Sequence, residues 1–177
     1  YELYINGEKI GDHCLAPLYT RFDRRNLYVA YDVTSQLQNG DNAIGVLLGN
    51  GWYNHQSKAV WDFDRAPWRN RPTFCLDLRI TYTDGSVETI PTDLSWRIAS
   101  GAITFNSIYT GEHYDARLEQ KGWSTPEFDD SKWRGVAYRS VPSSNVTAQQ
   151  VHPIRNVKIF PAVSFRKVDE KTYIYDF

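Results

Sequence analysis

The sequence predicts an all-β fold, an antiparallel β-sandwich, and three observations support this class. Apolar and polar residues alternate with a period of two over much of the chain, which is the pattern of a half-buried strand. Turn dipeptides such as Asn6-Gly7 and Asp84-Gly85 separate the alternating runs. No stretch has an amphipathic helical pattern longer than about two turns. Strands joined by tight turns, without helices between them, indicate antiparallel pairing.

The first fifty residues contain a hairpin and two further strands. Asn6-Gly7 stands between residues 1–5 and 8–10 and is a two-residue hairpin signal. Residues 26–34 alternate as a strand. Residues 42–48 form an apolar run that is typical of a buried strand.

A long loop and a long hairpin follow. Residues 52–72 have neither helical nor strand periodicity but carry three Trp residues, and a loop of that length in a compact domain is usually functional or disordered. The aromatic content argues against disorder. Residues 72–93 alternate on both sides of Asp84-Gly85 and are expected to form a hairpin. Residues 95–109 add one or two more strands.

The composition changes near residue 140. We expect a β-sandwich domain over residues 1–140, a polar linker rich in turn residues over 141–152, and the first strands of a second β unit, cut short, over 153–177. The chain is therefore expected to be part of a longer protein.

Charge and composition exclude two kinds of partner. The net charge of −1 provides no basic field for nucleic acid or for an anionic membrane surface. No run approaches the roughly 20 apolar residues of a membrane span. Cys14 and Cys75 match no metal motif, and they are expected to be two separate buried thiols, with a disulfide left open as the alternative.

The segment TGEHYDAR, residues 110–117, has the density of titratable groups found in active sites. If it is a strand, however, Glu112 and Asp115 point to opposite faces and cannot act as a glycosidase carboxyl pair. Asp115 and Arg117 share a face and are expected to form an ion pair, and Glu112 points with Tyr114. These four residues are expected to have a structural or inter-domain role, with ligand contact as the alternative. No Ser-His-Asp arrangement, zinc motif or phosphate loop is present, so we predict no catalytic residue.

Carbohydrate recognition is the chemistry that the 52–72 loop and its approach favour. A flat aromatic ring packs against the C–H face of a sugar, and carboxylates and amides accept hydrogen bonds from vicinal hydroxyls. The candidate residues of this region are Asn50, Trp52, Tyr53, Trp61, Asp64, Trp68 and Asn70. The alternative for each Trp is that it caps the end of the sandwich core. Calcium is a further candidate ligand, because it binds loop oxygens, but no spacing singles out a ligand set.

Several ordered segments together resemble the N-terminal β-sandwich region of bacterial α-L-rhamnosidases, glycoside hydrolase family 78. The segments cover nearly the whole chain: YELYINGEKIGDHCLAP, YTRFDRRNLYVAYDVTSQLQNGDNAIGVLLGNGWYN, RPTFCLDLRITYTDGSVETIPTDLSWR, IYTGEHYDARLEQKGWSTPEFDDSKW and the terminal YIYDF. GNGWYN and GEHYDAR are the most specific of these motifs. The expected fold is accordingly a sandwich of the jelly-roll, galactose-binding-like type.

The resemblance implies a parent enzyme that hydrolyses terminal α-L-rhamnose with inversion, using acidic residues on a separate (α/α)6 barrel. This chain has no pattern for such helices and is expected to lack hydrolase activity. In some members a corresponding sandwich binds rhamnose with the help of calcium, and an Asp in the segment that matches RFDRRN lies near the sugar and the ion. Asp23 matches that position, so the resemblance implies sugar and calcium binding there, although Arg24 stands where an Asn often follows.

Two hypotheses follow. In the first, the chain is a non-catalytic module that binds L-rhamnose or related plant-type glycans through Asp23, Arg24 and the aromatic loop, with calcium at Asp23 as a candidate cofactor. In the second, it is a purely structural domain that buttresses the catalytic barrel. The expected partners are a rhamnose-containing carbohydrate and other domains of the parent chain. The chain carries no compartment signal; we expect a periplasmic or secreted parent, with a cytoplasmic one left open.

Overall fold

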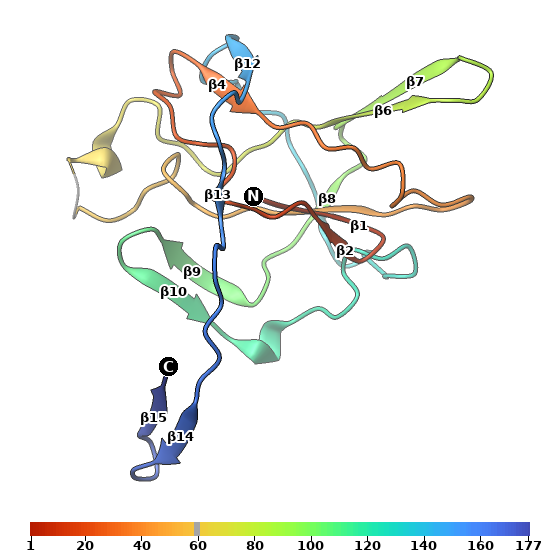
Figure 1. The fold of residues 1–177 in the computed structure, drawn as a ribbon. Coiled ribbons are helices and arrows are strands. Elements are labelled where there is room, and N and C mark those ends of the chain that lie inside the picture. Colours follow the sequence, from red (N-terminus) through yellow and green to blue (C-terminus); the bar gives the residue numbers. More distant parts are fainter. Residues whose placement is uncertain (59–60) are drawn as a thin grey trace.

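Strands and turns make up nearly all of the regular structure, which confirms the all-β prediction. The computed structural model describes residues 1–58 and 61–177, and within them the only helical elements are two short 3-10 turns (Figure 1). The first strands are β1 (Glu2–Ile5), β2 (Glu8–Ile10), β3 (His13–Cys14), β4 (Asn26–Tyr28), β5 (Ile44–Leu47), β6 (Asp77–Thr81), β7 (Val87–Pro91) and β8 (Arg97–Ile98). The later strands are β9 (Ile103–Ser107), β10 (Gly111–Tyr114), β11 (Arg134–Gly135), β12 (Val146–Ala148), β13 (Ile154–Arg155), β14 (Ser164–Lys167) and β15 (Tyr173–Asp176), and the 3-10 turns are η1 (Phe63–Arg65) and η2 (Ala116–Leu118).

The centre of the fold is the three-stranded sheet β2-β1-β5. The predicted hairpin is present, because Asn6 and Gly7 adopt φ of 51° and 85° and turn β1 back onto β2. β5 pairs on the other side of β1, with Ile44 opposite Ile5. The buried side chains of this sheet, Leu3, Ile5 and Ile10, form the hydrophobic core cluster.

The remaining strands associate in pairs around this sheet. The antiparallel pairs are β6–β7, β8–β11, β9–β10, β3–β13 and β14–β15. β4 and β12, in contrast, are parallel, so the expectation of purely antiparallel pairing is wrong at this position. The pairing also places an ordered strand inside residues 141–152, which the sequence analysis assigned to a linker; the domain boundary itself stays a prediction.

Three local expectations are corrected. The strand expected over 26–34 ends at Tyr28, because its partner β12 ends at Ala148, which stands opposite Tyr28. The strand expected over 42–48 is shorter and mostly half-buried, with only Gly45 buried. Both cysteines are free, yet Cys14 is half-buried and Cys75 is exposed. Cys75 lies outward because its neighbours Phe74 and Leu76 alternate to the inner face.

The C-terminal hairpin β14–β15 lies apart from the other strands, at the bottom of Figure 1. Its further backbone hydrogen bonds run within the hairpin, from Val163 N to Asp176 O and from Val168 N to Thr172 O. All of its strand residues except Ile174 are exposed. In the described part of the chain no helix is long and apolar enough to cross a membrane.

Candidate functional site

The aromatic residues of the 52–72 loop form a packed cluster around Trp52. The ring of Trp52 contacts those of Tyr19 (5.5 Å between centroids), Phe63 (5.5 Å) and Tyr109 (5.6 Å). Loop residues therefore pack against residues that come from both sides of the loop in the sequence. Tyr19, Phe63 and Tyr109 were not among the predicted site residues, although all three lie in motifs of the family resemblance or beside a predicted residue.

Phe22 and Phe63 connect the other predicted aromatic residues to this cluster. Phe22 contacts Tyr53 (5.2 Å) and Trp68 (6.4 Å), and Phe63 contacts Trp68 (6.1 Å). Trp61 contacts Phe63 edge-on (5.7 Å). The structure thus brings together all four of the predicted aromatic residues, which are Trp52, Tyr53, Trp61 and Trp68.

Burial divides these four residues into two groups. Trp52, Tyr53 and Trp68 are half-buried, as expected of residues that cap the core. Trp61 is 79% exposed. Trp61 therefore has an open ring that could meet a ligand, and Phe63 links it to the half-buried rings of Trp52 and Trp68.

Amides of the predicted site hold the loop in place. Asn50 receives a hydrogen bond on its side-chain oxygen from Asn54 (2.7 Å), and its own amide nitrogens donate to Asn106 on β9 (2.7 and 2.9 Å). The Asn70 backbone N–H donates to Tyr53 O (3.3 Å), and Asn70 itself is exposed. Asn50 is thus committed to the fold, whereas the side chain of Asn70 accepts only from the neighbouring Arg71 amide (2.9 Å) among the described residues.

His55 is the most buried large side chain of the cluster and was missed by the sequence analysis. It is 1% exposed, stacks on Trp52 (5.7 Å) and lies edge-on to Tyr109 (6.0 Å). Within residues 1–58 and 61–177 neither of its ring nitrogens has a hydrogen-bond partner, and the same holds for Asp64 Oδ1, Trp68 Nε1 and Ser107 Oγ. Buried polar atoms are nearly always paired, so this cluster retains hydrogen-bonding capacity that the fold does not use. No sequence signal marks His55 as part of this cluster, because its burial depends on neighbours that only the fold brings together.

The carboxylate of Asp23, the residue predicted to bind sugar and calcium, is paired with an arginine. Both of its carboxylate oxygens accept hydrogen bonds from the Arg21 guanidinium (2.9 and 3.2 Å). In the described residues no three His, Cys, Asp or Glu side chains gather closely enough to hold a metal ion. Arg24 is exposed, and its carbonyl accepts from Asn145 Nδ2 (3.2 Å). Asp23 and Arg24 are therefore in a turn closed by Arg21, beside Phe22 and the aromatic cluster.

The GEHYDAR segment is a strand only as far as Tyr114. Asp115 caps η2, accepting from the Arg117 amide (3.1 Å), and forms the predicted ion pair with the Arg117 guanidinium (2.8 Å). Hydrogen bonds from Arg117 hold the pKa of Asp115 below its usual value. The Tyr114 hydroxyl donates to Glu119, which raises the pKa of Tyr114. Glu112 is exposed on β10. The segment is therefore not one strand through residue 117, because the Asp115 cap ends it.

Comparison with known proteins identifies the family. Residues 1–158 match the family model described as the α-L-rhamnosidase N-terminal domain. The chain belongs to this family. An α-L-rhamnosidase of Formosa agariphila is 38% identical over 100% of this chain and 19% of its own length. These matches confirm the resemblance that the sequence motifs indicated.

Solved structures agree with this assignment to the α-L-rhamnosidase N-terminal domain family. The α-L-rhamnosidase from Dictyoglumus thermophilum is 40% identical with a TM-score of 0.85, over 99% of this chain and 19% of that one. The Streptomyces avermitilis α-L-rhamnosidase, described as complexed with L-rhamnose, is 34% identical with a TM-score of 0.87, over 99% of this chain and 17% of that one. The chain thus spans about a fifth of the length of these relatives, and the matches place it in their N-terminal domain.

Proposed function

We propose that this domain is a non-catalytic carbohydrate-binding module of an α-L-rhamnosidase, and that it binds L-rhamnose or related plant-type glycans beside Trp61. The observation that carries the proposal is the 79% exposure of Trp61 on a loop whose other aromatic side chains are packed. An open indole offers a flat surface to the C–H face of a pyranose. The relative described as complexed with L-rhamnose makes this sugar the first ligand to test.

The packed cluster supports this role because it holds the loop before a ligand arrives. Phe63 contacts Trp61 and is itself held between Trp52 and Trp68. A preformed loop loses little conformational entropy when a sugar binds. Asp64, the residue after Phe63, is half-buried, and its Oδ1 is buried without a partner in the described residues. In this proposal Trp61 contacts the sugar, and Trp52 and Trp68 position it through Phe63.

Calorimetric titration of the protein with L-rhamnose, with calcium and with EDTA, tests the proposal. We expect binding in the millimolar range in both conditions, because Asp23 is paired with Arg21. Trp61→Ala is expected to abolish binding. Tyr138→Ala is the matched control, because Tyr138 is also a highly exposed aromatic side chain, at 73%, but lies outside the cluster. Absence of binding at millimolar rhamnose in both conditions would overturn the proposal.

The second candidate function is a structural domain that buttresses the catalytic part of the parent enzyme. It is favoured by the exposed apolar side chains near the C-terminus, among them Val157 (96% exposed), Ile159 (82%) and Val163 (78%). Such a concentration is typical of a surface that another domain covers. In this case Trp61→Ala changes no ligand affinity.

Both functions place hydrolysis elsewhere in the parent. We expect the isolated chain to release no product from an aryl α-L-rhamnoside. If the chain did release product, and if Glu112→Gln reduced that release, the non-catalytic assignment would be contradicted.

A further inference from the structure

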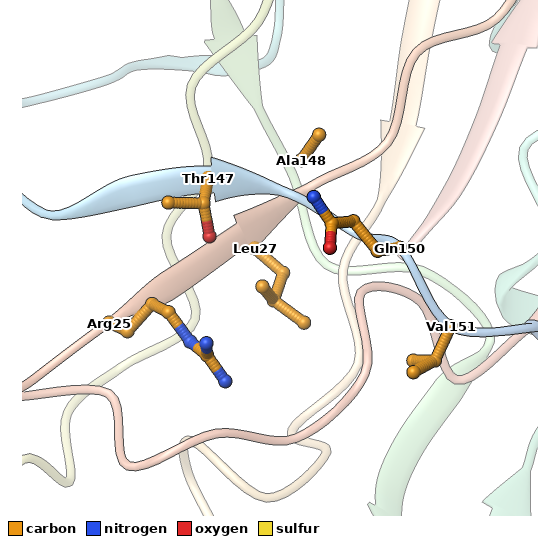
Figure 2. A pocket seen from close by; sticks show the side chains of 6 residues that line it. All are labelled: Arg25, Leu27, Thr147, Ala148, Gln150 and Val151. Atoms are coloured by element: carbon orange, nitrogen blue, oxygen red, sulfur yellow. The ribbon is translucent and has the colours of Figure 1, made fainter.

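A hollow of about 290 Å³ lies beside the parallel strand pair β4–β12, and the aromatic cluster does not contribute to it. It is lined by Arg25, Leu27, Thr147, Ala148, Gln150 and Val151. Figure 2 shows the side chains of Arg25, Leu27 and Val151 extending to the same side of the two strands, with the Thr147 hydroxyl facing that side too. The hollow therefore has one cationic wall and an apolar floor.

The backbone around this hollow is held firmly on both strands. Thr147 stands opposite Leu27 in the register, so residues about 120 positions apart in the sequence become neighbours. The Asn26 side chain donates to Ser143 O (3.0 Å), and the Gln149 amide donates to Tyr28 O (2.9 Å). The Gln149 side chain accepts from the Leu18 amide (3.0 Å). These bonds fix the positions from which the lining side chains project.

The polar side chains of the hollow are not used by the fold. Arg21, Arg117 and Arg155 each form an ion pair with an aspartate. Arg25, in contrast, has no carboxylate within 4.0 Å among the residues that the structure describes. In the same part of the chain, Thr147 Oγ1 and the Gln150 amide make no hydrogen bond. Three donors thus face or border the hollow without partners.

We propose that this hollow binds the carboxylate of an acidic saccharide, a uronate. A guanidinium presents a planar fork of donors that matches both oxygens of a carboxylate. The Thr147 hydroxyl and the Gln150 amide can bond ring hydroxyls, and Leu27 and Val151 provide an apolar surface for the sugar's C–H groups. The saccharide part of this inference rests on the proposed carbohydrate-binding function; the carboxylate part rests on Arg25 alone.

Titration of the protein with D-galacturonate tests the inference. The matched ligand is the methyl ester of the same sugar, which removes the charge and keeps the ring. We expect galacturonate to bind at least about tenfold more tightly than the ester, which is the factor that a charge-assisted hydrogen bond of ordinary strength supplies. Acetate and inorganic phosphate test for a general anion site, and L-rhamnose is titrated in parallel.

Variants locate the site. Arg25→Gln is expected to weaken galacturonate binding at least about tenfold and to leave rhamnose binding unchanged, whereas Arg25→Lys, which keeps the charge but not the fork, is expected to weaken it less. Arg79→Gln is the control, because Arg79 is likewise exposed but lies on β6, outside the hollow. Circular dichroism confirms that each variant is folded.

The inference would be overturned by equal affinity for galacturonate and its ester, by equal affinity for acetate or phosphate, by no effect of Arg25→Gln, or by an equal effect of Arg79→Gln. Binding of rhamnose without binding of galacturonate would overturn the uronate site and leave the proposed function standing. Binding of galacturonate without rhamnose would support the uronate site and overturn the rhamnose site beside Trp61.

Discussion

Trp52 and Trp61 lie on the same loop, but their different burial gives them different roles. Trp52 is half-buried, and its ring contacts those of Tyr19, Phe63 and Tyr109. Trp61 is 79% exposed and touches Phe63 with one edge. Removal of the Trp52 ring opens the cluster, whereas removal of the Trp61 ring takes away surface that water already reaches. Substitution of Trp52 is therefore expected to affect stability, and substitution of Trp61 is expected to affect ligand binding.

We predict that Trp52→Ala lowers the free energy of unfolding by about 3 kcal/mol, at the lower end of the range for large aromatic truncations, because Trp52 is only half-buried. Trp61→Ala is expected to cost less than about 0.5 kcal/mol, as at other surface positions. Urea denaturation followed by circular dichroism measures both values. Similar losses for the two variants would show that Trp61 also belongs to the packing of the loop.

Gly45 is needed because the Trp123 ring lies against its Cα. A Cβ built at residue 45 would lie 2.4 Å from Trp123 Cζ3, and the Trp123 ring also packs edge-on against Tyr4 (5.2 Å). We predict that Gly45→Ala destabilises the protein by about 1–3 kcal/mol through overpacking. Gly101→Ala is the control, because a Cβ there meets nothing within 4 Å. Thermal unfolding compares the two, and a loss confined to Gly101→Ala would contradict this account.

At the scale of elements, local turn chemistry could be predicted and distant pairing could not. Asn6-Gly7 and Asp84-Gly85 specify their hairpins, since residues within the turn decide the backbone conformation. The parallel pairing of β4 with β12 depends on segments about 120 residues apart, and neither carries a sign of its partner. For the same reason residues 141–152 had the composition of a linker although they contain a paired strand.

The two C-terminal elements are expected to differ in their contribution to stability. β14 and β15 pair only with one another in the described fold, whereas β13 pairs with β3, and Arg155 on β13 bonds Asp12 (2.7 Å). We predict that deletion of residues 159–177 changes Tm by less than about 2 °C. Deletion of residues 151–177 is expected to lower Tm by at least about 4 °C, equivalent to roughly 1–2 kcal/mol for a chain of this size.

Differential scanning calorimetry of the two truncated chains provides the comparison. Because both deletions remove the β14–β15 hairpin, the difference between them isolates residues 151–158. A large decrease in Tm for the shorter deletion would mean that the β14–β15 hairpin packs on the sandwich, and this account would then be wrong.

For the whole molecule, the aromatic loop could be located from the sequence, but which of its rings are buried and which is exposed could not. Aromatic, carboxylate and amide side chains in residues 50–70 indicated sugar recognition, and their convergence could be expected from their density. Which rings are covered depends on Tyr19, Phe22 and Tyr109, which reach the loop only through the fold. The hollow at Arg25 could not be predicted for the same reason, because four of its six lining residues come from residues 147–151, far from Arg25 in the sequence.

Acid stability is also a property of the whole molecule, because lowered aspartate pKa values are spread along the chain. Hydrogen bonds from Arg155 lower the pKa of Asp12, and those from Arg117 lower the pKa of Asp115. Turn hydrogen bonds from Ser86 and Ser95 do the same for Asp84 and Asp93. The unfolded chain lacks these bonds, so in acid it binds more protons than the folded chain. Stability must then fall as the pH falls.

The sign and the pH window of this effect lead to a prediction. Each of these aspartates contributes stability that is fully present above its unfolded pKa, near 3.8, and is lost as the pH falls through the lower folded value. We predict that the urea midpoint decreases steadily below about pH 4, and that Asp12→Asn reduces the slope because residue 12 no longer titrates. Added salt is expected to reduce the part that comes from the exposed pairs with Arg155 and Arg117, since ions screen such charges, and to leave the turn contribution in place. The prediction would be contradicted by a urea midpoint that did not change between pH 4 and pH 2, or by a slope that was the same in Asp12→Asn. Either result would show that these carboxylates have the same pKa in the folded and the unfolded chain.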